Sequence, residues 1–196
     1  MNTKRMRGNA GQALIETALM LPILLVMLIN AVNLGYFFLV VLNITAAPRS
    51  GLLYAIVGPS SPAATNYPAA GGASTTTVSY LTQQDLTGAL YNPAANATVQ
   101  VCSQVIGTNG SGSALKSNCI SCTGGTCGSV NSGGTGEVPD ADPEAPSFVL
   151  HRVDVGYTFS PLIPGWPFNL ALLSTSVCNA GGTSCTFHRF AEMRGM

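Results

Sequence analysis

The sequence predicts an α+β fold in which one long N-terminal helix packs on a small antiparallel sheet, with disulfide-rich loops. A nearly wholly apolar run extends over residues 13–42 and contains a single charged side chain, Glu16. Segments with the residue alternation of strands follow in the second half of the chain. Six cysteines lie beyond the apolar run: Cys102, Cys119, Cys122, Cys127, Cys178 and Cys185.

The apolar run is long enough to cross a membrane. A hydrocarbon core of ~30 Å is spanned by about 20 apolar residues in a helix. A helix over residues 12–47 would be about 54 Å long, so its C-terminal third should protrude and pack on the rest of the chain. Lys4, Arg5 and Arg7 precede the run, which favours a cytoplasmic N-terminus and an extracytoplasmic remainder. A cleaved secretory signal peptide has the same basic start but a shorter apolar core.

Glu16 places a carboxylate near one end of a segment from which lipid excludes charge. An unpaired carboxylate at depth costs roughly 2 kcal/mol or more, although near the edge it reaches the interface. If a peptidase cuts after Gly11, Gln12 becomes the first residue and Glu16 the fifth. The new α-amino group could then pair with the carboxylate of an adjacent subunit. The charge would thus set the register of assembly rather than add stability.

The N-terminal segment also carries a family resemblance. The residues that carry it are those of 7–19, with Gly11, Gln12 and Glu16 at their places, then Leu21 and Pro22, and more loosely 44–51, 153–162 and 191–194. This pattern resembles the class III signal peptides of type IV pilin-like proteins. It is most similar to the TadE-like family, the minor pseudopilins of bacterial tight-adherence (Flp-type) pilus systems.

The resemblance implies a pilin-like fold and a non-enzymatic subunit that takes part in assembling a Tad/Flp-type pilus or filament. A prepilin peptidase would cleave between Gly11 and Gln12, and Glu16 would contact another subunit. The implied partners are other pilin or pseudopilin subunits, the inner-membrane pilus-assembly platform and membrane lipid. The protein would be a single-pass inner-membrane protein that enters a surface pilus. The alternative is an uncleaved single-span protein presenting a disulfide-stabilised extracytoplasmic binding module.

These expectations divide the chain into a leader (1–11), a transmembrane and assembly helix (12–47) and an extracytoplasmic domain (48–196). Pro48 stands where the family continues its helix. A proline inside a helix costs about 3 kcal/mol, so we expect the helix to end near Ala47 or to kink before 49–57. A Cys/Gly-rich insertion is expected at about 107–146.

The composition argues against a nucleic-acid partner and against an enzyme. Charged residues make up 8% of the chain, against ~25% in typical soluble domains. Without the leader, five basic and eight acidic residues remain, a net charge of −3, so no basic patch is expected. No phosphate loop, zinc-protease helix or spaced Ser/His/Asp set appears. His151 and His188 are read as packed or surface residues, and no cofactor is expected.

The cysteines are predicted to form disulfides, because all six follow the span on its oxidising side. Cys178 and Cys185 flank a turn-forming stretch and should form a local bridge. Cys102 should pair with one cysteine of the cluster at 119–127, leaving two to pair within it. The C-x-x-C at 119–122 is also compatible with zinc or redox chemistry, but its Gly/Ser-rich setting without a following helix favours disulfides.

The remaining elements follow from residue patterns. After a Pro/Gly-rich connector (58–72), β-branched residues predict an edge strand at 75–80, and helical spacing predicts a helix at 81–91. Strands are predicted at 98–106 and 148–159, separated by a loop (107–137) and an acidic linker (140–144) that could also bind calcium. Segments 170–177 and 185–194 should pair as antiparallel strands, giving three or four strands in all.

Within the strand at 148–159, period two separates two faces. Val149, Val153 and Val155 should face the core together with the aromatic residues that follow. Arg152 and Asp154 fall on the opposite face, where we expect a solvated ion pair.

Overall fold

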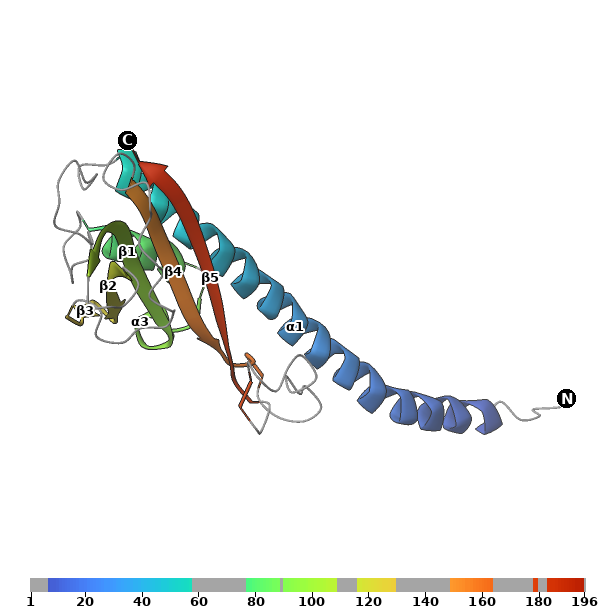
Figure 1. The fold of residues 1–196 in the computed structure, drawn as a ribbon. Helices are drawn as coiled ribbons and strands as arrows, with labels where there is room; N and C mark the ends of the chain where they lie inside the picture. Colours follow the sequence, from blue (N-terminus) through green and yellow to red (C-terminus); the bar gives the residue numbers. More distant parts are fainter. Residues whose placement is uncertain are drawn as a thin grey trace, which may run out of the picture.

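The structure is a computed structural model that describes residues 7–57, 77–88, 90–108, 116–129, 149–163, 178–179 and 183–195. It has an α+β fold: a long helix, α1 (Arg7–Val57), and an antiparallel sheet. The N-terminal half of α1 projects away from the body, whereas its C-terminal half lies along the sheet (Figure 1). The predicted fold class is confirmed at this level, and the pilin-like character of the fold stays a prediction.

The sheet contains five strands among the described residues. Its order is β3-β2-β1-β4-β5, and every neighbouring pair is antiparallel. The strands are β1 (Ala97–Thr108), β2 (Lys116–Thr123), β3 (Thr126–Cys127), β4 (Val149–Phe159) and β5 (Cys185–Gly195), and the short helices are α2 (Val78–Thr87) and α3 (Pro93–Asn96). The sheet thus exceeds the three or four strands expected.

The expected end of the first helix near Ala47 is wrong, because α1 continues through Pro48 to Val57. The reason is packing. Buried side chains recur at helical spacing on both sides of the proline: Asn33, Val40, Ile44, Ala47, Leu52 and Ala55. Burying a leucine side chain contributes about 1.5–3 kcal/mol, which is comparable to the proline's cost. Continuing the helix keeps Leu52 and Ala55 in the core.

The core lies between α1 and one face of the central strands. Val99 and Val101 of β1 lie opposite Val155 and Val153 of β4, and all four are buried. At one end of the sheet, the ring of Phe37 packs edge-on against Phe159 with centroids 5.5 Å apart. The face of β4 predicted to be apolar therefore is the one that packs on the helix.

Helix α2 packs closely on α1 at a glycine. A Cβ atom placed on Gly51 would overlap the Oγ1 atom of Thr82, whose hydroxyl donates to the carbonyl of Val78 at 2.8 Å. The neighbouring Ser50 hydroxyl donates to the Asp85 carboxylate. The strand expected at 75–80 is wrong for 78–80, which begin α2; residues 75–76 lie outside the described residues.

The loop expected over 107–137 is also wrong in part, because β1 extends to Thr108 and β2 and β3 form within it. Cys102 and Cys119 lie directly opposite each other in β1 and β2 and are bridged. Cys122 is bridged to Cys127 and Cys178 to Cys185, so the expected local bridge is present. The strand expected at 170–177, the connector (58–72) and the acidic linker (140–144) lie outside the described residues.

Candidate functional site

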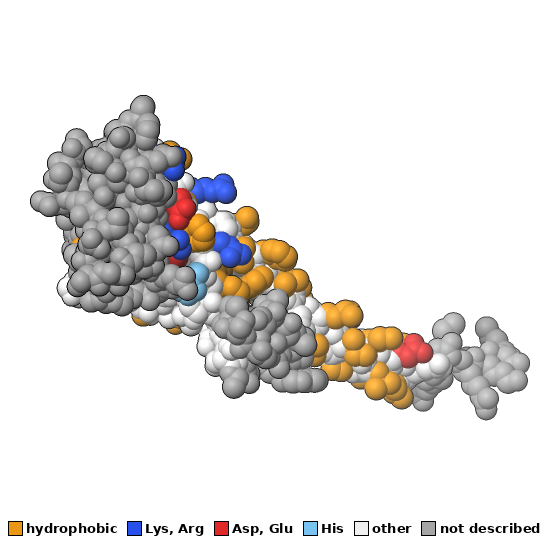
Figure 2. All heavy atoms as spheres, viewed as in Figure 1, with side chains coloured by type: hydrophobic (Ala, Val, Ile, Leu, Met, Phe, Trp, Pro, Cys, Tyr) orange, Lys and Arg blue, Asp and Glu red, His pale blue; other side chains and the backbone are white. Residues whose placement is uncertain are grey.

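The candidate site is the exposed half of α1, residues 11–32. Nearly all of its side chains are exposed, and most are large and apolar; Leu24, for example, is 63% exposed. In Figure 2 apolar side chains cover this half of the helix where it leaves the body. At 1.5 Å per residue it is about 33 Å long, close to the ~30 Å of a bilayer's hydrocarbon core. The helix is thus compatible with a single-pass membrane anchor.

Asn33 marks the place where the exposed half ends and the packed half begins. Its side chain is completely buried. The Nδ2 group donates to the carbonyl of Ile163 at 3.0 Å, and the Oδ1 atom accepts from the N–H of Ile163 at 3.0 Å. The interruption of the apolar run at Asn33 is therefore a tertiary contact that attaches the segment after β4 to the helix.

The predicted site residues Gly11, Gln12 and Glu16 all lie on the exposed half. A Cβ atom placed on Gly11 would meet no heavy atom within 4 Å. Within the described part of the chain, nothing packs against this end of the helix. It is therefore sterically open to a peptidase or to another subunit.

Glu16 differs from two other polar side chains of this half, those of Thr17 and Asn30. The hydroxyl of Thr17 donates to the carbonyl of Ala13 at 2.8 Å, and the amide of Asn30 donates to that of Val26 at 2.9 Å. Such bonds to the preceding turn satisfy polar groups within one helix. A carboxylate has no proton to donate to a carbonyl, and Glu16 makes no hydrogen bond or ion pair with the described residues. Its exposed carboxylate is therefore free to pair with a group outside the described residues.

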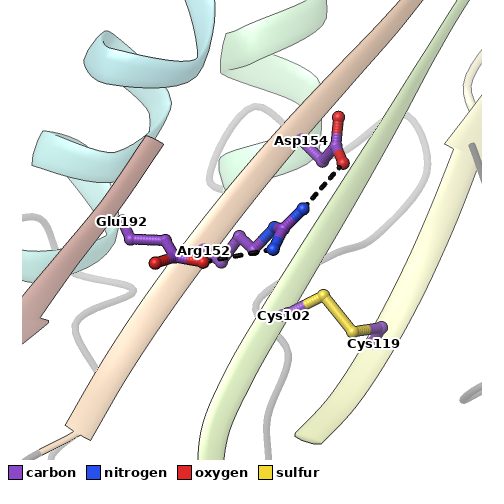
Figure 3. Close-up of a disulfide and its surroundings, with 5 residues drawn as sticks. All are labelled: Cys102, Cys119, Arg152, Asp154 and Glu192. Atoms are coloured by element: carbon purple, nitrogen blue, oxygen red, sulfur yellow. Dashed lines mark hydrogen bonds and ion pairs between the residues drawn. A yellow bond between two sulfur atoms is a disulfide. The ribbon is translucent and has the colours of Figure 1, made fainter. Parts of the chain in front are cut away.

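A second polar group lies on the face of the sheet that is turned away from α1. Arg152 lies between Asp154 and Glu192, at 3.3 Å and 3.2 Å from their carboxylate oxygens, beside the bridge between Cys102 and Cys119 (Figure 3). Asp154 is 2% exposed, so the solvated pair expected for Arg152 and Asp154 is wrong. The expectation failed because the part of this face around Asp154, with Gln100 and Cys102 of β1, is buried rather than open to solvent.

This second group links β4 to β5 through the ion pair of Arg152 with Glu192. Burial raises the pKa of Asp154, and the charge of Arg152 opposes that shift. Burial lowers the pKa of His151 to about 4, while His188 is exposed. Among the described residues, no three of the His, Cys, Asp and Glu side chains form a group that could hold a metal ion.

The functional assignment is not carried by known relatives. Comparisons with protein-family models, with curated proteins and with solved structures found no match to this chain. The TadE-like resemblance stays a prediction from the residues of 7–22 and their spacing.

Proposed function

We propose that this protein is a pilin-like (pseudopilin) subunit of a Tad/Flp-type bacterial pilus or filament. A prepilin peptidase cleaves it after Gly11, and it assembles through the exposed half of α1. The observation that carries the proposal is Glu16, a carboxylate that pairs with no described residue on the exposed and largely apolar half of α1, five residues from Gly11.

The apolar side chains on the exposed half of α1 must be shielded from water, because an apolar surface of this extent is not stable in contact with it. Lipid covers it in a single-pass membrane protein, and the same surfaces of other copies cover it in a filament. The α-amino group of a neighbouring Gln12 supplies the cation that Glu16 lacks. Because that pair forms only when two helices are correctly staggered, it selects the register of assembly.

The topology of the proposal agrees with the distribution of charges and disulfides. Lys4, Arg5 and Arg7 precede the helix and favour the cytoplasm. All six cysteines follow it, and all are bridged in three disulfides, as is typical of an oxidising compartment. Both observations support a folded domain on the extracytoplasmic side of the inner membrane.

Cleavage is tested by sequencing the N-terminus of the membrane-bound protein, with Gly11→Val and Gly35→Val as a matched pair. Both glycines lie in α1 with no heavy atom within 4 Å of an added Cβ, so both variants should fold. We expect wild type and Gly35→Val to start at Gln12 and Gly11→Val to keep Met1. An intact Met1 on functional wild-type membrane protein would overturn the proposal in favour of the uncleaved, membrane-anchored binding module.

Assembly is tested by Glu16→Gln and Glu16→Ala, with Thr17→Val as the control. Glu16→Gln removes the charge but keeps the shape, whereas Thr17→Val removes an adjacent polar group whose hydrogen bond lies within the helix. We expect both Glu16 variants to insert in the membrane but to be lost from isolated filaments, while Thr17→Val assembles. Glu16→Gln subunits present in filaments at the wild-type level would contradict the role of Glu16.

A further inference from the structure

One end of the sheet lies beside the boundary between the exposed and the packed half of α1, near Asn33. At this end β4 finishes at Phe159, opposite Cys185 of β5. The ring of Tyr36 lies 5.5 Å from that of Phe159, and Asn33 holds the backbone of Ile163. The segment after β4 is thus fixed at the level of Asn33 along the helix axis.

This end of the domain exposes apolar and aromatic side chains. We define the collar as Tyr91, Leu162 and Ile163, of which Tyr91 is 66% and Leu162 55% exposed. The backbone of Tyr91 is held by two hydrogen bonds: its N–H donates to the hydroxyl of Tyr36, and its carbonyl accepts from that of Tyr157. The collar is therefore a fixed surface, and it borders a hollow of about 340 Å³ between Tyr36 and Leu162.

The position of the collar coincides with the edge of a bilayer. Residues 11–32 cover about 33 Å, so the hydrocarbon core ends near Asn33. The headgroup layers add about 5–7 Å on each side, and the collar is held at that level. Tyrosine beside aliphatic residues is the composition typical of membrane–water interfaces. The described residues at this end, 90–92 and 160–163, carry no charge.

We propose that the collar rests in the interfacial layer of the leaflet from which α1 emerges, with the lipid headgroups and upper acyl chains of that leaflet as its partner. Lipid is favoured over a second copy, because the collar continues the apolar surface of the exposed half of α1 at the plane where lipid surrounds a spanning helix. The inference rests on the membrane anchoring of the proposed function and does not depend on pilus assembly.

The test uses the full chain in phosphatidylethanolamine/phosphatidylglycerol vesicles, with Trp166→Phe as background so that one new tryptophan reports its surroundings. The three positions are Leu24→Trp in the exposed half of α1, Leu162→Trp in the collar, and Leu53→Trp as the matched control. Leu53 is 52% exposed, nearly as much as Leu162, but lies 20 residues beyond Asn33 on α1, about 30 Å away. A Trp166→Tyr background replaces the first if that one does not fold.

Quenching by lipids carrying a label at the headgroup or deep in the acyl chain gives the result. We expect the headgroup label to quench Leu162→Trp more than the deep label, the deep label to quench Leu24→Trp more, and neither to quench Leu53→Trp. If Leu24→Trp is quenched but Leu162→Trp is quenched as weakly as Leu53→Trp, the inference about the collar is overturned, while the membrane anchoring stands. If the emission of Leu162→Trp is blue-shifted but not quenched, the collar lies in an apolar environment that is not lipid. That result would overturn the inference in favour of contact with a second copy. An unquenched Leu24→Trp would overturn the membrane anchoring itself.

Discussion

The side-chain amide of Asn33 closes two hydrogen bonds with the backbone of Ile163, 130 positions further along the chain. One bond satisfies the N–H of Ile163 and the other its carbonyl, and Asn33 is completely buried. The pair therefore determines where the end of β4 sits along α1. It also places the collar relative to the part of the helix that is proposed to lie in lipid.

Replacing Asn33 by leucine should detach this contact. Both backbone groups of Ile163 lose their partner, and a typical hydrogen bond contributes about 0.5–1.5 kcal/mol. Asn43→Leu is the control, because the amide of Asn43 donates only within its own helix, to the carbonyl of Leu39 at 2.7 Å. We expect Asn33→Leu, but not Asn43→Leu, to lower the thermal unfolding temperature in detergent and to speed amide exchange at 160–163. Equal unfolding temperatures in the two variants would count against the tether.

Gly51→Ala and Gly35→Ala should change stability in opposite directions. Alanine is favoured over glycine inside a helix by about 1 kcal/mol, and an added Cβ at Gly35 meets open space. At Gly51 the same atom overlaps the hydroxyl of Thr82 and must push α2 away from α1. We expect denaturant unfolding to show Gly35→Ala as more stable than wild type and Gly51→Ala as less stable. Adding Thr82→Ala to Gly51→Ala should recover part of the loss; no recovery would place the cause elsewhere.

His151 should make the fold acid-sensitive. Burial lowers its pKa to about 4 in the folded state, whereas the unfolded chain takes up the proton near 6.5. Between these values the unfolded state binds more protons, so stability is present above pH 6.5 and is lost as the pH falls towards 4. Relative to His151→Gln, wild type should lose about 2–3 kcal/mol over this range.

The measurement is denaturant unfolding at several pH values. Asp154, whose pKa is raised by burial, acts in the opposite sense, but it is common to both proteins and cancels in the comparison. A constant difference between wild type and His151→Gln across the range would refute the prediction.

The disulfides should contribute unequally to stability. Cys102–Cys119 closes a loop with a sequence separation of 17, and Cys122–Cys127 one of 5. The loss of loop-closure entropy in the unfolded chain then gives about 3 kcal/mol for the first bridge and about 2 kcal/mol for the second. Replacing each pair by serines should lower the unfolding temperature more for Cys102/Cys119. Thiol titration of the unreduced protein should find no free thiol, and six free thiols in exported protein would contradict the assignment.

Patterns dominated by burial allowed much of the fold to be predicted. The apolar run predicts α1, and the alternation around Val99 and Val101 predicts β1 within two residues at each end. β4 and β5 follow in the same way. β2 was missed because its eight residues contain one large aliphatic side chain, Ile120, and its place in the sheet comes from pairing with β1. Such pairing leaves no pattern within the strand itself.

Other errors have a tertiary origin. The local penalty of Pro48 was taken to end the helix, but packing on the sheet carries α1 past it. Arg152 and Asp154 alternate with apolar residues as surface residues do, yet Asp154 is buried. Asn33 looked like an interruption of the apolar run, and its partner lies too far along the chain for a local pattern to indicate it.

For the candidate site, the sequence supplied the residues and the structure supplied their surroundings. Spacing identified Gly11, Gln12 and Glu16, and the structure leaves all three exposed on a helix that nothing in the described part of the chain covers. Cleavage and subunit pairing stay predictions. The collar was not foreseen, because Tyr91 and Leu162 come together only through the hydrogen bonds of Tyr36 and Asn33.

The passage of α1 through Pro48 has a mechanical consequence. The sheet grips the helix on both sides of the proline, through Ile44 before it and Leu52 after it, so no joint separates the domain from the stem that carries it. A displacement of the helix at Asn33 would therefore be transmitted to the sheet without a hinge at Pro48. The domain would tilt and shift together with the helix that carries it.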